Sequence, residues 1–233
     1  KYIEKGESFV IVTHVSPDGD AIGYALGLFH FLNAYGKENV SVIVPNDYPN
    51  FLKWMPGTKD VTIYEKYPEF SEQLISDADV IFCLDFNDPK RIEKLADPVL
   101  KSEARKVLID HHLHPVEFCN VTMSYPNISS TSEMVFRFIC RMGLFDLIDK
   151  NAAECIYTGM MTDTGAFTYN SNHPEIYTII GELIKLGIDK DLIYRRINQV
   201  YSEGRLRLMG YVLYEKMKVH HDMQAAMIAL SVD

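Results

Sequence analysis

The stretch FVIVTHVSPDGDAIG, residues Phe9–Gly23, runs from an apolar segment directly into a polar turn. Residues 9–12 are uncharged β-formers, which is typical of a strand buried on both faces. Pro17 and Gly19 predict a turn, and from Asp20 onward apolar residues recur at helical spacing. The stretch therefore predicts a strand, a loop and a helix.

The predicted loop carries one histidine and two aspartates, His14, Asp18 and Asp20. In an open α/β fold such a loop lies at the carboxyl end of a strand, where these sheets bind ligands. The loop lacks the glycine spacing of a phosphate-binding fingerprint, and its carboxylates would repel a phosphate unless a divalent metal ion lay between them. An alternative from this segment alone is that Asp20 caps the helix while Asp18 and His14 lie in a solvated turn.

Composition narrows the class of protein. A chain of 233 residues with 47% hydrophobic residues can bury one main domain with a small appendage. The net charge of −9 argues against binding to long duplex DNA, and small anionic substrates reached through metals remain compatible with it.

No apolar run suggests a membrane helix and the first residues are no signal peptide, so we expect a cytoplasmic protein without a membrane partner. In that compartment we expect reduced thiols at Cys83, Cys119, Cys140 and Cys155.

Further strand patterns at residues 40–44, 80–84 and 107–109 alternate with helical or loop segments. This alternation predicts an α/β fold with a mostly parallel sheet flanked by helices. From residue 131 the pattern becomes helical, and Ser130 with Glu133 and Asn151 with Glu154 have the spacing of N-terminal capping boxes.

The C-terminal part is expected to be helical and to lead into a second element. Pro174 suits the first turn of a helix that ends at Gly187, and a last helix covers roughly residues 203–218. A strand is expected within 223–232, after a turn at 220–222. We therefore expect three parts: a catalytic domain, 1–187; a helical linker, 188–218; and the start of a truncated second domain, 219–233.

Acidic and histidine residues follow two more of the predicted strands. Asp85 ends the apolar run ADVIFCLD, and Asp110 with its two following histidines ends RKVLID. Because parallel strands share one carboxyl edge, these side chains can converge with those of the first loop, which predicts a metal site. Asp163 ends an apolar helix, where its charge opposes the helix dipole unless a cation offsets it; the alternative is a surface aspartate in a turn.

Four motifs in the chain resemble those of the DHH phosphoesterases. They are THVSPDGDAIG, LDFNDPKR, the DHH of residues 110–112 and TGMMTDTGAF, in the family's order and spacing over roughly residues 10–169. Within the family, SSTSEMVFRF and MTDTGAF look most similar to the branch of nano-RNases and phosphoadenosine phosphate (pAp) phosphatases and to the related RecJ exonucleases. The manganese pyrophosphatases look less similar.

The resemblance implies a two-metal site whose ligands are His14, Asp18, Asp20, Asp85, His111 and Asp163. The first two would hold one ion, Asp85 would bridge, and the other three would hold the second ion. Carboxylates and imidazoles suit manganese, so we expect two Mn²⁺ ions, with Mg²⁺ as a substitute. Such a pair can hold a shared water as hydroxide, which is the expected nucleophile.

We assign His112 to the substrate, because neighbouring residues on a strand point to opposite faces, so that His111 and His112 cannot both ligate one metal unless the chain bends. There His112 would stabilise phosphoryl charge or protonate the leaving oxygen. Asp110 is expected either to orient a neighbouring histidine or to cap the strand end.

Three further residues are candidates for substrate contacts. Ser130 and Thr131 could offer hydroxyls and backbone amides to a phosphate, although helix capping explains them equally well. Arg91 lies six residues beyond Asp85 and could contact the substrate, with a structural ion pair as the alternative.

The expected function is hydrolysis of very short oligoribonucleotides by 3′–5′ exonuclease action, of pAp, or of both. The alternatives are a pyrophosphatase or exopolyphosphatase with the same metal centre, which would need clustered Lys and Arg, and a catalytically idle nucleotide-binding module. Partners would be short RNA or nucleotides, and a homodimer is compatible with the sequence. Family members bind substrate through a glycine-rich segment of a second domain, whereas this chain has no glycine after Gly210.

Overall fold

The computed structural model describes residues 1–231. Contacts divide the chain into two compact units, Lys1–Ile197 and Asn198–Asp233. This division falls within the range 188–218 that the sequence suggests as a linker. The expected catalytic domain, 1–187, and second domain, from residue 219, stay predictions.

The first unit contains a six-stranded parallel sheet in the order β3-β2-β1-β4-β5-β6. Its strands are β1 Ser8–Val12, β2 Asn39–Val44, β3 Val61–Ile63, β4 Val80–Leu84, β5 Arg105–Asp110 and β6 Val121–Ser124. The strand order reverses between β1 and β4, which is the position where open α/β sheets bind ligands. The predicted α/β fold is confirmed.

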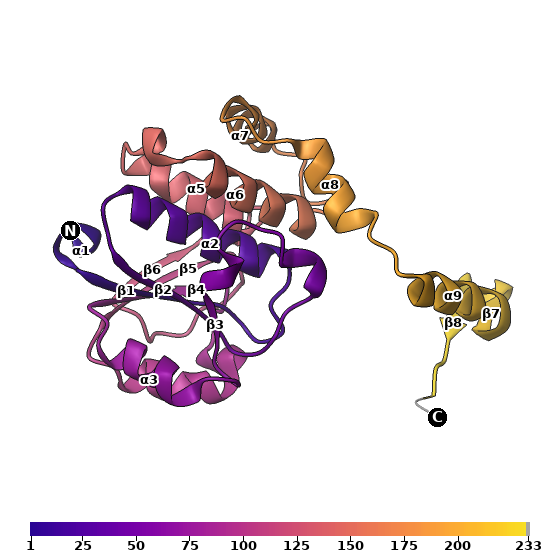
Figure 1. The fold of residues 1–233 in the computed structure, drawn as a ribbon. Coiled ribbons are helices and arrows are strands. Elements are labelled where there is room, and N and C mark those ends of the chain that lie inside the picture. Colours follow the sequence, from indigo (N-terminus) through magenta and orange to yellow (C-terminus); the bar gives the residue numbers. More distant parts are fainter. Residues whose placement is uncertain (232–233) are drawn as a thin grey trace. The chain divides into compact units, whose positions relative to one another are not determined.

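Helices cover both faces of this sheet (Figure 1). One face packs on α2 Gly19–Ala34, α5 Thr131–Arg141 and α6 Lys150–Asp163, and the other on α3 Pro68–Ser76 and α4 Ala96–Lys101. The unit also contains α1 Tyr2–Lys5, α7 Pro174–Lys185 and all but the last residue of α8 Lys190–Asn198, with 3-10 helices at Asn50–Leu52, Thr58–Asp60, Pro89–Leu95 and Phe145–Leu147. The central strands are therefore apolar on both faces, and polar chemistry is confined to their ends.

Helix caps agree with the sequence at α5 and differ at α2 and α6. Ser130 caps α5, where its Oγ accepts a hydrogen bond from the Glu133 amide at 3.1 Å. Helix α6 is capped by Asp149 instead of Asn151, because Asp149 Oδ1 accepts from the Ala152 amide at 2.7 Å. The cap of α2 is Asp18 and not Asp20, which frees Asp20 for a buried position.

Close packing of α2 on α6 depends on glycine, since a Cβ at Gly23 would lie 2.7 Å from both the Cys155 carbonyl oxygen and the Gly159 Cα. The Gly23→Ala variant is therefore expected to lose about 1–3 kcal/mol of unfolding free energy, because backbone atoms cannot move aside cheaply. Urea unfolding measures this loss. The matched variant Gly181→Ala lies on α7, where a Cβ would meet no atom of the described residues within 4 Å, and should be neutral or slightly stabilising. Equal stability of the two variants would contradict the packing argument.

The second unit contains a helix and a hairpin. Helix α9, Glu203–Tyr211, continues as a π-helical turn at Val212–Lys216, and β7 Met217–His220 pairs antiparallel with β8 Ala225–Ile228. The predicted helix over 203–218 is thus too long at its end, since its last two residues belong to β7. The turn between the strands covers residues 221–223, one residue later than expected. Of the predicted strand range 223–232, β8 covers residues 225–228, and the last residue lies outside the described residues.

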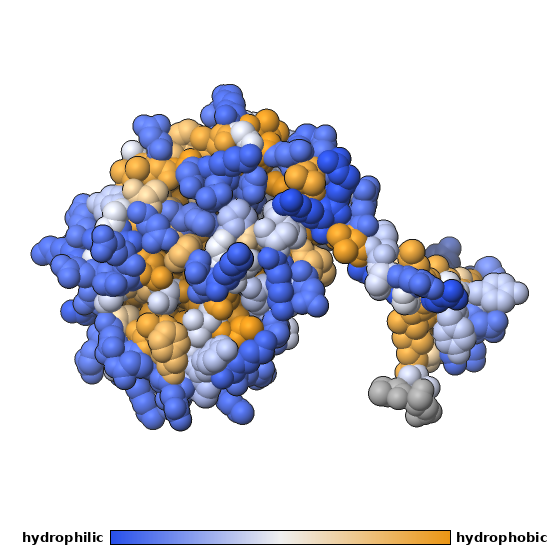
Figure 2. Space-filling model, in the orientation of Figure 1, coloured by the Kyte–Doolittle hydropathy of each residue, from blue (hydrophilic) through white to orange (hydrophobic). Residues whose placement is uncertain are grey.

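Apolar side chains of this second unit are exposed, as the orange surface in Figure 2 shows. They include Leu206, Leu208, Leu213, Met223 and Leu230. All four cysteines of the chain lie within the described residues and are free thiols. Within residues 1–231, the structure contains no helix with the length and apolar character needed to cross a membrane.

Candidate metal centre

Side chains from four segments meet at the carboxyl edge of the sheet. Asp85, directly after β4, lies in the middle: its Oδ2 is 3.6 Å from His14 Nε2 and its Oδ1 is 3.3 Å from His111 Nε2. Asp18 Oδ1 lies 4.0 Å from His14 Nε2, and Asp163 Oδ2 lies 3.8 Å from His111 Nε2. Loops that are far apart in the sequence therefore converge on one carboxylate.

Backbone conformation aims these side chains at the cluster. Asp85 has a φ of +64°, a left-handed conformation that is uncommon for a residue other than glycine, and its amide donates to the Ile109 carbonyl at 2.9 Å. Ser16 has a φ of +54°, and its amide donates to Asn46 Oδ1 at 2.7 Å. Strained residues of this kind persist where the surrounding structure holds them, as at functional sites.

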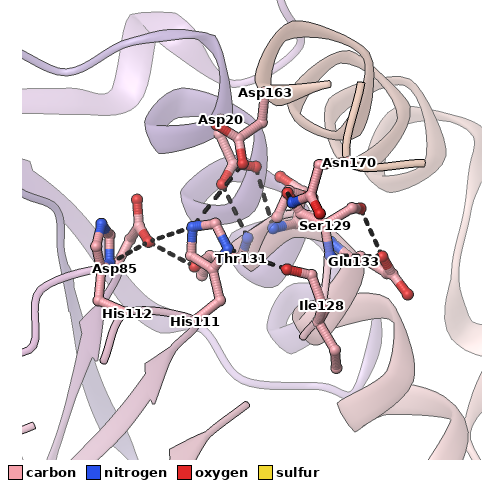
Figure 3. Close-up of polar contacts among 12 residues, drawn as sticks. Asp20, Asp85, His111, His112, Ile128, Ser129, Thr131, Glu133, Asp163 and Asn170 are labelled. Atoms are coloured by element: carbon pink, nitrogen blue, oxygen red, sulfur yellow. Dashed lines mark hydrogen bonds and ion pairs between the residues drawn. The ribbon is translucent and has the colours of Figure 1, made fainter. Parts of the chain in front are cut away.

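The first turn of α5 holds two of the carboxylates, an arrangement that the sequence did not indicate (Figure 3). The amides of Thr131 and Ser132 donate to the two oxygens of Asp20 at 2.9 and 3.1 Å. The Thr131 hydroxyl donates to Asp85 Oδ1 at 2.7 Å. Donors at a helix N-terminus stabilise negative charge, so α5 compensates part of the buried acidity.

The carboxylates of the cluster are electrostatically crowded. Burial, together with the charges of Asp85 and Asp163, raises the pKa of Asp20 well above its usual value. Burial also raises the pKa of Asp163 to about 6, with His111 opposing this shift and Asp85 adding to it. Groups that are this costly to ionise together are what a bound cation would stabilise.

Neighbouring histidines have the opposite effect on the pKa of a carboxylate. Burial opposes ionisation of Asp85, but its hydrogen bond with His111 and the charges of His111 and His14 leave its pKa lowered. His111 has its pKa raised to about 9, because the hydrogen bond and charge of Asp85 outweigh burial. The His111 imidazole thus partners Asp85, and a metal ion can also compensate the charge of this carboxylate.

The donor set fits divalent cations. Ligand atoms of Asp20, His111 and Asp163 lie within 4.8 Å of one another, as do those of Asp85, His111 and His112. Mixed carboxylate and imidazole donors are typical of sites for Mn²⁺ and related ions. The first of these groups is the ligand set that the sequence suggests for one of the two metals.

His112 lies on the same side as His111, because β5 ends at Asp110 and the chain bends there. The two rings are 5.0 Å apart at 72°, so the alternation expected for a strand does not extend to this pair. Asp110 is fully buried and accepts from both the Nδ1 and the amide of His112, at 2.8 and 2.9 Å. This contact is the one expected of a residue that orients a histidine.

The substrate candidates occupy different environments. Arg91 Nη1 lies 3.1 and 3.0 Å from the two ring nitrogens of His112, which brings a guanidinium to the cluster. Ser130 and Thr131 are fully buried, and their hydroxyls are used in the α5 cap and the Asp85 contact. Contact of these three residues with a substrate stays a prediction.

A parallel α/β sheet with this cluster at its carboxyl edge defines a protein whose site suits divalent cations. The comparison with known families agrees: residues 8–160 match the model described as the DHH family, N-terminal domain. The chain belongs to the DHH family, and the resemblance seen in its motifs is confirmed.

Two curated relatives align with most of the length of this chain. It is 34% identical to the bifunctional oligoribonuclease and PAP phosphatase NrnA of Thermus thermophilus over 87% of this chain and 57% of that protein. The identity to the Bacillus subtilis protein of the same name is 26%, over 88% of this chain and 61% of the relative. The chain therefore spans about three fifths of the length of these curated relatives.

A solved structure is more similar still. The crystal structure of an exopolyphosphatase-related protein from Bacteroides fragilis is 61% identical and superimposes with a TM-score of 0.96. The match covers 98% of this chain and 67% of that one. This agreement extends the family assignment to the three-dimensional structure.

Proposed function

We propose that this chain carries the catalytic part of a metal-dependent phosphoester hydrolase that acts on very short oligoribonucleotides and on pAp. The observation that carries the proposal is the position of Asp85, whose Oδ2 faces His14 and whose Oδ1 faces His111. A shared carboxylate of this kind suits two cations that act on one phosphate. The names of the Thermus and Bacillus relatives support the choice of substrates.

We assign two Mn²⁺ ions to the cluster, one to His14 and Asp18 and the other to Asp20, His111 and Asp163, with Asp85 shared between them. Bound divalent cations supply Lewis acidity here, which acidifies a water molecule and offsets the charge of the phosphate. The carboxylates of the chain hold these cations in place. Their crowding, visible in the raised pKa values of Asp20 and Asp163, supports a strong preference for cations.

His112 and Arg91 lie next to each other in the site. Asp110 accepts a hydrogen bond at His112 Nδ1, which keeps a proton on that atom and fixes the ring. Arg91, next to this ring, can donate to phosphoryl oxygens, since a guanidinium matches phosphate geometry. We assign substrate binding to both residues and proton donation to the leaving oxygen to His112.

The experiment that tests this function is product analysis with Mn²⁺ and three substrates: a labelled RNA dinucleotide, pAp and pyrophosphate. The proposal expects mononucleotides from the first and AMP from the second. Orthophosphate from pyrophosphate alone would overturn it and favour a pyrophosphatase or exopolyphosphatase, the activity to which the name of the Bacteroides structure relates. Nucleotide binding without turnover would instead indicate an idle binding module.

Removal of the Arg91 guanidinium is expected to weaken substrate binding more than turnover. Since a hydrogen bond to a charged group contributes about 1.5–3 kcal/mol, Arg91→Ala should raise the KM for pAp by about tenfold or more, with a smaller change in kcat. Steady-state kinetics measure both constants. Arg105→Ala, an exposed arginine at the start of β5, is the matched control. A KM unchanged from the wild type would argue against the assignment of Arg91.

The net charge of −9 agrees with small anionic substrates reached through cations and not with long duplex DNA. Cytoplasmic location and a homodimer stay predictions. Mg²⁺ in place of Mn²⁺ is also part of the proposal, since both ions accept carboxylate oxygen ligands.

A further inference from the structure

Thr131 joins two carboxylates that come from distant parts of the chain. Its amide donates to Asp20 Oδ2 at 2.9 Å, and its hydroxyl donates to Asp85 Oδ1 at 2.7 Å. Asp20 lies in the first turn of α2, whereas Asp85 follows β4. One residue thus fixes two groups that the sheet alone does not hold together.

Because these residues are buried, the two hydrogen bonds are difficult to replace. Thr131 is fully buried, and Asp20 and Asp85 are only 2% and 5% exposed, so water is a poor substitute for the two donors. A buried carboxylate that loses a hydrogen-bond donor costs about 1–3 kcal/mol or reorients to find another.

Neighbouring contacts keep Thr131 itself in place. The Ser130 cap fixes the start of α5, and Glu133 accepts hydrogen bonds from both the amide and the hydroxyl of Ser129. The adjacent carbonyl of Ile128 lies 3.2 Å from His111 Nδ1, which directs His111 Nε2 toward Asp85 (Figure 3). Hydrogen bonds therefore hold the start of α5 and the segment before it next to the cluster.

We propose that Thr131 is a positioning residue that aligns Asp85 with Asp20 for metal binding. This role rests on the proposed metal centre and differs from the substrate contact expected from the sequence. The hydroxyl reaches Asp85 and not the surface, so Thr131 acts through the carboxylate that both ions would share. Residues that orient ligands in this way typically contribute 10–100-fold to metal affinity.

The test is a titration with Mn²⁺, in which electron paramagnetic resonance detects the free ion. Thr131→Val removes the hydroxyl but keeps the shape of the side chain and the hydrogen bond that the backbone amide donates to Asp20, and should weaken Mn²⁺ binding by about 10-fold or more. Thr131→Ser restores a hydroxyl and should bind within about threefold of the wild type. Thr178→Val makes the same change on the exposed face of α7 and should bind as the wild type does.

Thermal unfolding of the metal-free variants distinguishes positioning from loss of structure. The proposal holds if metal-free Thr131→Val unfolds cooperatively, with no larger decrease in unfolding temperature than the loss of one buried hydrogen bond explains, and loses affinity while Thr131→Ser keeps it. Wild-type affinity in Thr131→Val, or equal loss of affinity in the valine and serine variants, would overturn it. Absence of Mn²⁺ binding by the wild type would contradict the metal centre itself, and this proposal with it.

Discussion

Replacing Asp85 with asparagine is expected to reduce turnover of pAp and of short RNA by about a thousandfold or more, because the change removes the charge that the two proposed cations would share. Asparagine keeps the shape of the side chain and tolerates the left-handed backbone at this position, where φ is +64°. Its amide oxygen can still accept the Thr131 hydrogen bond. The loss should therefore be one of metal binding and chemistry and not of folding.

Kinetics, together with metal analysis of the purified variant, check this prediction. Asp85→Asn should retain less than the wild-type complement of Mn²⁺ and unfold at a similar temperature when metal-free. Asp146→Asn, at an exposed site, makes the same chemical change and should leave both turnover and metal content unchanged. Near wild-type turnover in Asp85→Asn would show that the cluster is not the catalytic centre.

Removal of divalent cations is the second change with a large expected effect. Three carboxylates, those of Asp20, Asp85 and Asp163, crowd together here, and burial raises the pKa of the first and the third. Cations that bind only the folded chain stabilise it by about 2.7 kcal/mol at one hundred times their dissociation constant. For a chain of this size that corresponds to an increase of roughly 5–10 °C in unfolding temperature.

Chelation followed by buffer exchange should therefore abolish turnover and lower the unfolding temperature, and Mn²⁺ should restore both. Thermal unfolding with and without Mn²⁺ measures the second effect independently of activity. The Asp85→Asn variant is the control, since its unfolding temperature should respond little to Mn²⁺. Persistence of turnover in the presence of a strong chelator would contradict a metal-dependent mechanism.

Much of the cluster could be predicted because apolar strands here end in acidic or histidine residues. Val80–Leu84 and Arg105–Asp110 are parallel neighbours, so Asp85 and His111 share an edge once the sheet forms. Four central strands were recognisable from their continuous apolar runs. The edge strands β3 and β6 were not, since they are short and partly exposed and lack such runs.

Other features depend on tertiary contacts that local patterns do not encode. Asp18 and Asp20 both fit the rule for a helix cap, and only the packing of α5 against Asp20 distinguishes them. The SSTSE motif indicated the start of a helix, but its hydrogen bonds to Asp20 cross more than a hundred residues of sequence. The sequence likewise did not predict the bend that brings His112 beside His111.

The central claim is that this cluster holds two cations around Asp85. Crystals of the protein grown with Mn²⁺, measured near the manganese absorption edge, test it most directly through anomalous difference density. We expect two peaks, one beside His14 and Asp18 and one beside Asp20, His111 and Asp163, with Asp85 between them. A single peak, or none at this edge of the sheet, would contradict the two-metal account.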